Sequence, residues 1–264
     1  TVGITRPCTK HNWLVKDTNE LSETIHKAFQ VALTGRPGPV LVDVPKDVQF
    51  ATGKYVSRKN LSKLNLLPPK RENSIAIEHA VDAIVKATKP VLYVGGGVIN
   101  SGPKATNLLR ELAAETNFPV TSTLMGLGCY PASGRSWLGM LGMHGTYEAN
   151  MTMHDCDLMI CIGARFDDRI TGRIDAFSPN STKIHIDIDP SSINKNINVD
   201  IPIVGDISEV LTEILLKWRT KGSKTKSKEI KNWWKVIDGW REIKCLNYKN
   251  SSNVIKPQYA LERL

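Results

Sequence analysis

The sequence has no apolar run long enough to cross a membrane and no cysteine pattern that would hold a disulfide scaffold. A membrane helix needs about 20 consecutive apolar residues, and no stretch of the 264 residues approaches that length. The five cysteines are odd in number and include no C-x-x-C pair. We therefore expect no membrane association, no disulfide framework and a reducing compartment.

The sequence also lacks an initiator methionine and an apolar signal segment at its beginning. Its first residues, "TVGITRPCTK", contain no h-region of a signal peptide. We expect the chain to be a piece of a longer, cytoplasmic protein, and a plastid or mitochondrial location stays open.

Excess positive charge is confined largely to one segment. Residues 217–249 hold eleven basic and three acidic residues, which accounts for +8 of the net charge of +9. Four tryptophans lie in the same segment: Trp218, Trp233, Trp234 and Trp240. Basic residues interleaved with aromatics can bind nucleic acid with steeply salt-dependent affinity. Because the charge is local, we favour a linker helix whose tryptophans pack on a neighbouring domain, and no nucleic-acid partner.

Residues 1–50 contain one helix and one strand, which is too little to form a core. The segment "DTNELSETIHKAFQVALTGRPGP" predicts a helix capped by Asp17 or Thr18 and ended by Gly35 and Pro37. The segment "PVLVDVP" (39–45) predicts a short strand. Residues 51–74 lack periodicity and include "LPPKREN", so they predict an interdomain linker.

From residue 75 apolar strands alternate with amphipathic helices. Helices are predicted near 75–88, 103–116, 146–154 and 207–218. The five predicted strands are "PVLYVGGGVI", "FPVTSTL", "LMICIGA", "KIHIDIDP" and "IPIVGD". This alternation predicts an α/β fold with a doubly wound, mainly parallel sheet and helices on both faces, spanning 75–218. Residues 219–253 would then be a basic linker, and 254–264 the start of another domain.

Ligands bind at the carboxyl ends of the strands in such a sheet, so the residues that follow each strand are informative. The triplet Gly95–Gly97 follows the first strand and would expose backbone amides to phosphate. "GARFDDR" (163–169) follows the third, and Arg165 or Arg169 can neutralise a pyrophosphate. Asp187 ends the fourth strand, where an acid accepts sugar hydroxyls. These residues predict a site for a dinucleotide or a similar ligand.

Other interpretations of these residues stay open. Asp167 and Asp168 can equally orient the arginines or cap a turn, and the whole motif can be a surface salt-bridge cluster. The glycine-flanked pair Met143–His144 can lie against a flat ring, although a lone histidine is more often structural.

A zinc site is not expected among the histidines and cysteines of residues 154–161. Cys161 lies inside a predicted strand, and His154 and Cys156 have no evident further ligands. We also expect no catalytic nucleophile, no phosphate-binding P-loop and no metal site within the chain.

Eight motifs spread over nearly the whole chain resemble one family. They are "TKHNWLV", "TGRPGPVLVDVPKDV", "KPVLYVGGGVINS", "TSTLMGLG", "MLGMHGTYEAN", "IGARFDDRITG", "KIHIDIDPSSINKN" and "IKPQYALERL". Their content and order resemble the catalytic large subunit of acetohydroxyacid (acetolactate) synthases, which are thiamine-diphosphate enzymes.

The resemblance implies a three-domain subunit of which this chain is a part. Residues 1–50 would end a pyrimidine-binding domain, 75–218 would form a central FAD-binding domain, and 254–264 would begin a diphosphate-binding domain. The family decarboxylates pyruvate on thiamine diphosphate with magnesium, and joins the two-carbon unit to pyruvate or 2-oxobutyrate in branched-chain amino-acid synthesis. Its FAD performs no net redox chemistry. A homo-oligomer, either dimer or tetramer, and a small regulatory subunit are further expectations.

The resemblance also assigns residue roles. The implied FAD contacts are Arg36, Gly96, Thr123, Leu124, Met143, His144, Gly163, Arg165, Asp167, Asp168, Asp187, Ile188 and Asp206. Arg36 would reach the flavin from the first domain. The residues that resemble a substrate-access channel are Lys46, Met143, Asp168 and Arg169. From the residues alone, Lys46 is better explained as a surface lysine at the end of a strand.

The chain departs from the family where the chemistry is concerned. The activating glutamate would precede residue 1, the metal and diphosphate motif G-D-G would follow Leu264, and "GDI" (205–207) is not that motif. We therefore expect the chain by itself to be inactive. The alternatives are a fragment of a glyoxylate carboligase or flavin-dependent pyruvate oxidase, and a non-catalytic nucleotide-binding module.

Overall fold

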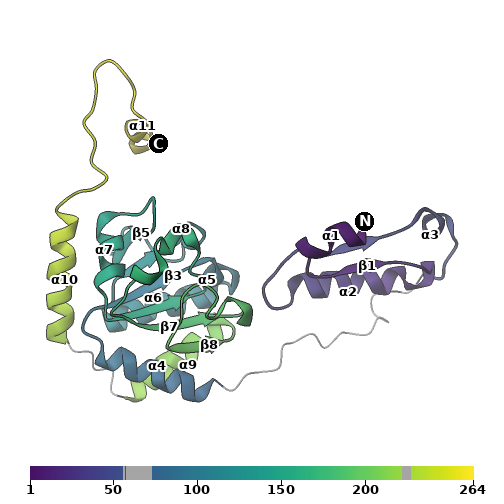
Figure 1. The fold of residues 1–264 in the computed structure, drawn as a ribbon, viewed down its shortest axis with the longest axis horizontal. Coiled ribbons are helices and arrows are strands. Elements are labelled where there is room, and N and C mark those ends of the chain that lie inside the picture. Colours follow the sequence, from purple (N-terminus) through teal and green to yellow (C-terminus); the bar gives the residue numbers. More distant parts are fainter. Residues whose placement is uncertain (56, 58–72, 222–226) are drawn as a thin grey trace. The chain divides into compact units, whose positions relative to one another are not determined.

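The structure is a computed structural model that describes residues 1–55, 57, 73–221 and 227–264 (Figure 1). The chain divides into two compact units, Thr1–Arg71 and Glu72–Leu264. Each unit is described by itself. Most of the predicted linker at 51–74 lies outside the described residues.

The first unit is a small parallel β–α–β arrangement. Strand β1 (Asn12–Leu14) pairs with β2 (Leu41–Asp43), and α2 (Leu21–Leu33) connects them. The predicted helix signals are confirmed: Asp17 caps the turn that leads into α2 by accepting the Asn19 N–H (2.9 Å), and Gly35 follows α2 with a φ of +59°. Short helices α1 (Val2–Thr5) and α3 (Lys46–Phe50) flank the strands in sequence.

The second unit is built on a six-stranded parallel sheet with the strand order β5-β4-β3-β6-β7-β8. Its strands are β3 (Pro90–Val94), β4 (Val120–Ser122), β5 (Trp137–Met140), β6 (Leu158–Ile162), β7 (Thr182–Asp187) and β8 (Ile201–Val204). The chain starts in the middle at β3, adds β4 and β5 on one side, and returns to β6 to build the other side. This confirms the predicted doubly wound parallel sheet. The direction in which the chain adds strands reverses between β3 and β6, which is the switch point of such a sheet.

Helices flank this sheet. Helices α4 (Ser74–Lys86), α9 (Ile207–Thr220) and α6 (Pro103–Thr116) lie next to one another, and α7 (Tyr147–Asp155) packs beside α10 (Ser227–Arg241). The short helices α5 (Gly96–Asn100) and α8 (Asp168–Thr171) follow β3 and β6, and α11 (Pro257–Arg263) lies near the end of the chain. Strands β3 and β6 are buried along their whole length, which explains their uninterrupted apolar sequences.

Two local predictions are corrected by the structure. The sequence predicts five strands, whereas the sheet has a sixth, β5, at its edge. This strand is short, contains Gly139 with a φ of +92°, and pairs irregularly with β4, so its apolar pattern is weak. The sequence also predicts no helix directly after β3, whereas Gly96 and Gly97 begin α5.

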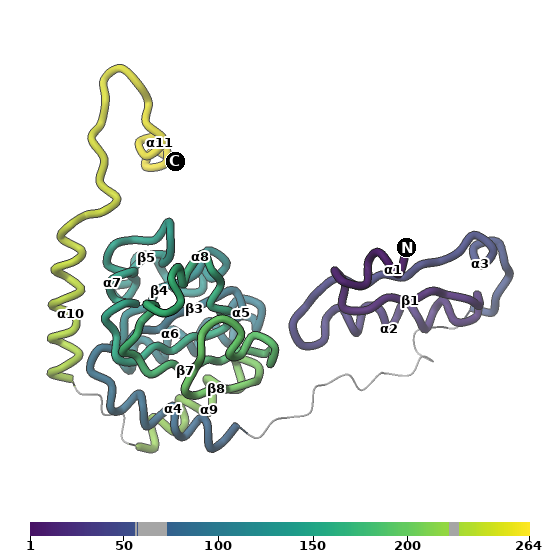
Figure 2. The backbone as a smooth tube through the Cα atoms, viewed as in Figure 1, coloured from purple at the N-terminus to yellow at the C-terminus, as the bar shows by residue number. Residues whose placement is uncertain are grey.

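Helix α10 contributes buried residues to the core of the second unit. It packs beside α7 (Figure 2). Its tryptophans are buried and hydrogen-bonded: Trp233 Nε1–H donates to Pro90 O (3.0 Å), and Trp234 Nε1–H donates to Asn117 O (2.8 Å). The segment 219–253, expected to be a basic linker, therefore contains a helix whose tryptophans are packed, as the sequence analysis favoured. The domain boundary at residue 218 stays a prediction.

Candidate functional site

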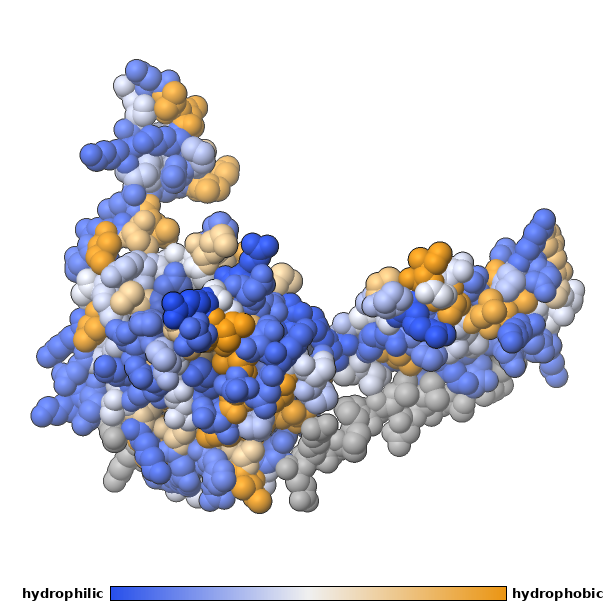
Figure 3. Space-filling view, in the orientation of Figure 1, coloured by the Kyte–Doolittle hydropathy of each residue, from blue (hydrophilic) through white to orange (hydrophobic). Residues whose placement is uncertain are grey.

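The carboxyl ends of the parallel strands meet at one edge of the sheet in the second unit. Gly95 follows β3, Thr123 follows β4, Gly163 follows β6, Asp187 ends β7 and Gly205 follows β8. Because all six strands run in the same direction, this edge gathers most of the residues predicted from the sequence. Figure 3 shows apolar surface among hydrophilic surface in the region of α5 on this unit.

Glycines at the switch point between β3 and β6 allow the backbone after β3 to contact the backbone after β6. The Gly97 N–H donates to Gly163 O (3.0 Å), and a Cβ at Gly97 would lie 2.7 Å from Gly163 Cα. Gly163 itself has a φ of +65°. The Gly95 N–H is also used, because it donates to the end of β6. Within the described residues, the Gly96 N–H has no hydrogen-bond acceptor, so one amide of the triplet is left for an anion.

The segment 163–169 carries two ion pairs. Arg165 Nη2 lies 2.6 Å from Asp167 Oδ2, and these side chains are 44% and 45% exposed. Arg169 Nε lies 3.8 Å from Asp168 Oδ2, and both side chains are largely exposed. Exposed pairs contribute at most about 1 kcal/mol to stability. Stability therefore does not explain four charges here, and Arg165 can exchange its carboxylate partner for phosphate at little cost.

Asp187 is held at the carboxyl end of β7. It is buried, and its Oδ1 accepts the Asp189 N–H (2.8 Å). Its Oδ2 lies 3.9 Å from Nε2 of His185, a fully buried side chain. Burial lowers the pKa of His185 below its ordinary value. Ile188, which follows Asp187, is half-buried at the same edge.

Apolar side chains are exposed at the ends of β4 and β5. Thr123 Oγ1 accepts the Gly126 N–H (3.2 Å) and so caps the turn that presents Leu124. Leu124 and Met143 are exposed, as is His144. The Met143 N–H donates to Arg169 O (3.3 Å), so the structure brings two predicted channel residues together. An exposed apolar surface beside charges suits a ligand with a flat ring and phosphates.

Asp206 has a structural use in this edge. Its Oδ1 accepts the Ser208 N–H (2.8 Å), so Asp206 caps the beginning of α9. This use does not exclude a second contact, since a carboxylate has two oxygens.

Arg36 and Lys46 lie in the first unit. Arg36 is exposed, and its carbonyl oxygen accepts a hydrogen bond from Lys10 Nζ (3.0 Å). Lys46 begins α3, with its Nζ 5.9 Å from the centre of the Phe50 ring. Their contacts with the flavin and the channel stay predictions.

The sequence analysis missed two buried residues next to the site, Phe166 and His185. Phe166 is buried and has a φ of +51°, which is rare for a bulky residue. Its ring contacts that of His185 edge to face, at 5.1 Å between centroids. The signal for His185 is the polar residue at an inward position of the apolar strand "KIHIDID". No sequence signal identifies Phe166.

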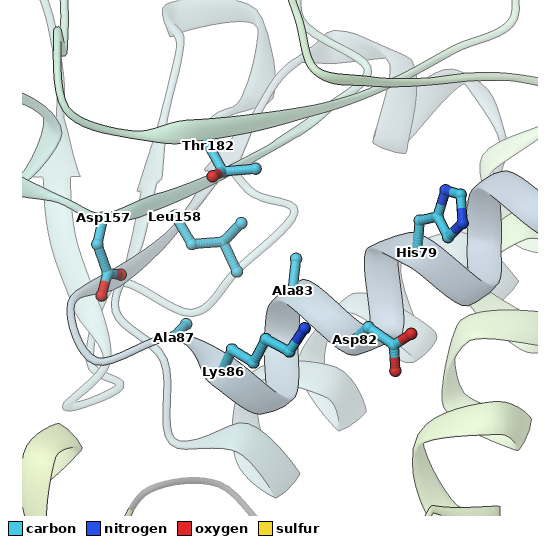
Figure 4. A pocket seen from close by; sticks show the side chains of 8 residues that line it. All are labelled: His79, Asp82, Ala83, Lys86, Ala87, Asp157, Leu158 and Thr182. Carbon is cyan, nitrogen blue, oxygen red and sulfur yellow. The ribbon is translucent and has the colours of Figure 1, made fainter.

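A hollow of the second unit lies at the opposite edge of the sheet (Figure 4). It measures about 390 Å³ and is lined by residues of α4 and by the beginnings of β6 and β7. Its acids have partners: Asp157 accepts bonds from the Thr88 N–H (2.7 Å) and the Lys89 N–H (2.9 Å), and Asp82 pairs with Lys221. We therefore interpret these acids as structural and place the candidate site at the carboxyl edge.

A smaller hollow of about 250 Å³ lies beside the candidate site. It is lined by Leu141, which follows β5, and by residues of α7 and α8 and the segment after them. Asn150 closes one side, because its side chain bonds to both the N–H (2.8 Å) and the oxygen (3.0 Å) of Gly142.

The described residues contain no group of three or more His, Cys, Asp or Glu side chains placed to hold a metal ion. Cys156 bonds to Ser178 Oγ (3.3 Å), and burial raises the pKa of its thiol to about 11. In the same part of the chain, no helix is both long and apolar enough to span a membrane.

Comparison with known families decides what kind of chain this is. The family described as "Thiamine pyrophosphate enzyme, central domain" matches residues 77–214, which include all six strands of the sheet. The chain belongs to the thiamine pyrophosphate enzymes.

This thiamine pyrophosphate enzyme chain is similar to acetolactate synthases along its whole length. It is 46% identical over 265 residues to acetolactate synthase isozyme 3 large subunit of Escherichia coli (strain K12), covering 100% of the chain and 46% of that protein. Identity is 44% with the large subunit of Haemophilus influenzae (99% and 45% covered) and 43% with acetolactate synthase of Mycobacterium bovis (99% and 42% covered). The chain therefore spans a little under half the length of these curated relatives.

Proposed function

We propose that this chain supplies the FAD-binding part of an acetolactate synthase large subunit. The observation that carries the proposal is the charged and apolar carboxyl edge of a sheet in a chain that is 42–46% identical to such subunits. This edge combines an unpaired backbone amide, Arg165 in an exposed ion pair and exposed apolar side chains.

The residues at this edge fit the chemistry of FAD. The Gly96 N–H and the guanidinium of Arg165 suit its pyrophosphate. Asp187 and Asp206 offer carboxylate oxygens to its hydroxyls. Leu124 and Met143 offer exposed apolar surface to its ring system. The other predicted contacts of the second unit follow the ends of the same strands: Gly163, Asp167, Asp168, Ile188, Thr123 and His144.

In the whole subunit, thiamine diphosphate with magnesium would supply the chemistry that removes carbon dioxide from pyruvate and transfers the two-carbon unit. This chain would contribute positioning, with FAD in a structural role. Lys46 and Arg169 would line the path of the 2-oxo acid substrates. We further propose assembly into a homo-oligomer with a small regulatory subunit, in the cytoplasm.

The test is titration of the 264-residue chain with FAD, followed by flavin fluorescence and absorbance. We expect saturable binding with one FAD per chain. Arg165→Ala should weaken it by about 10- to 100-fold, since a hydrogen bond to a charged group contributes about 1.5–3 kcal/mol.

Arg173→Ala is the matched control. Arg173 also pairs with an acid two residues later, Asp175 (2.8 Å), and is largely exposed, but it has no predicted contact with FAD. Equal affinities of the two variants would contradict the site. Bleaching of flavin by pyruvate in a complete subunit would instead favour a flavin-dependent oxidase.

A further inference from the structure

A row of buried polar side chains crosses the sheet beneath the segment 163–169. The strand register places Tyr93 beside Cys161, and Cys161 beside His185. Paired residues of adjacent strands point to the same face of a sheet, so these three side chains share one face. All three are fully buried. Buried polar groups usually have partners, and this row therefore requires an explanation.

Two members of the row hold the same backbone oxygen. His185 Nε2 lies 2.7 Å from Ala164 O, and Cys161 Sγ donates to the same oxygen (3.2 Å). Because a carbonyl oxygen only accepts, the proton of the neutral imidazole must be on Nε2. Nδ1 then has no proton, and it has no hydrogen-bond partner among the described residues. Burial, which lowers the pKa of His185, keeps the ring in this neutral form.

The ring of Phe166 packs against two members of this row, Tyr93 and His185. Its ring packs edge to face against Tyr93 (5.5 Å), His185 (5.1 Å) and Phe177 (5.9 Å), measured between centroids. Its φ of +51° is unfavourable for a side chain with a Cβ, so tertiary packing must hold it. This inward turn leaves the neighbours on either side, Arg165 and Asp167, half-exposed at the carboxyl edge.

We propose that His185 and Phe166 are positioning residues for the cofactor: they fix the backbone of Ala164–Asp167 so that Arg165 is presented to the pyrophosphate before it binds. Neither residue contacts the cofactor. Their contribution is preorganisation, since a fixed segment loses less conformational freedom on binding. The proposal rests on the proposed FAD site.

The decisive comparison is His185→Leu against His185→Gln. Leucine fills similar space but cannot donate to Ala164 O, whereas the glutamine Nε2 can reach the position of the imidazole Nε2 and donate. If His185 only filled space, leucine would be the better substitute. Cys156→Ala is the control, because it removes another buried side-chain hydrogen bond, to Ser178, away from this segment.

The experiment measures two quantities on the 264-residue chain. The first is amide hydrogen exchange without ligand at Gly163, whose N–H donates to Ile186 O (2.8 Å), and at Ile170, whose N–H donates to Asp167 O (2.9 Å). The second is FAD affinity by flavin fluorescence. We expect His185→Leu to speed exchange at least tenfold and to weaken FAD binding at least tenfold. His185→Gln and Cys156→Ala should stay within threefold of the wild type in both. Phe166→Leu, which keeps apolar volume but loses the ring contacts, should behave as His185→Leu does.

The two readouts separate this inference from the proposed function. Absence of FAD binding by the wild-type chain would overturn the proposed function. It would also overturn the expected changes in FAD affinity of the His185 and Phe166 variants. Unchanged exchange in both His185→Leu and Phe166→Leu would overturn the positioning role, whatever the wild type binds. Equal loss of affinity in the glutamine and leucine variants would also overturn it.

Discussion

Replacing Trp233 by alanine should destabilise the second unit strongly, because α10 is part of its core. Trp233 is 2% exposed, and its ring packs edge to face on Trp240 at 5.5 Å between centroids. Its Nε1–H donates to Pro90 O at the beginning of β3. Truncating a buried tryptophan costs about 3–5 kcal/mol. Loss of the hydrogen bond is included in that range.

This cost translates into a measurable shift in melting temperature. For a domain of this size, 1 kcal/mol shifts the melting temperature by about 2–4 °C. A loss of about 4 kcal/mol should therefore lower it by about 8–16 °C. Thermal unfolding of the 264-residue chain, followed by circular dichroism, measures the shift.

Two further variants serve as controls for Trp233→Ala. Val236→Ala, on the same helix but 46% exposed, should shift the transition by less than about 3 °C. Trp233→Phe keeps a ring and loses the N–H, so it should fall between the two. A shift of Trp233→Ala no larger than that of Val236→Ala would refute the claim that α10 belongs to the cooperative core.

Two other predictions follow from the buried His185 and from the close backbone contact at Gly163. Because burial lowers the pKa of His185, the unfolded state takes up the proton first as pH falls, so stability should decline below about pH 6.5. Urea titrations at pH 7.5 and 5.5 should show this loss in the wild type and not in His185→Gln; equal losses would contradict it. Gly163→Ala should destabilise the chain by more than about 2 kcal/mol, since a Cβ there meets Gly97 Cα at 2.7 Å, whereas Gly172→Ala, with open space, should cost about 1 kcal/mol. Comparable denaturation midpoints for the two alanine variants would show that the contact is not tight.

Local signals explain which helices the sequence could predict. Helix α6 was predicted at 103–116 and is observed at Pro103–Thr116, because Pro103 lies in its first turn and Asn117 follows it in the left-handed conformation. The carboxyl edge was also predictable, since uninterrupted apolar strands alternating with helices allow little besides a parallel sheet. The charged residues after β6 and β7 were placed by this topology alone.

Tertiary contacts explain what the sequence could not predict. The sequence predicts that the tryptophans of this segment pack on a neighbouring domain, but it does not predict where they pack. Their hydrogen-bond acceptors are the carbonyl oxygens of Pro90 and Asn117, which lie more than a hundred residues away in the chain. The ring of Phe166 is buried although it lies in the charged segment 163–169, for which the sequence pattern predicts exposure. The glycines after β3 were expected to expose amides, but two of the three serve contacts with the end of β6 and with Gly163.

The most direct test of the central claim is the FAD titration of the intact 264-residue chain. The account predicts saturable binding of one FAD per chain, weakened about 10- to 100-fold by Arg165→Ala and unchanged by Arg173→Ala. No flavin binding by the folded wild-type chain, or equal binding by the two arginine variants, would contradict the assignment of the carboxyl edge as the cofactor site.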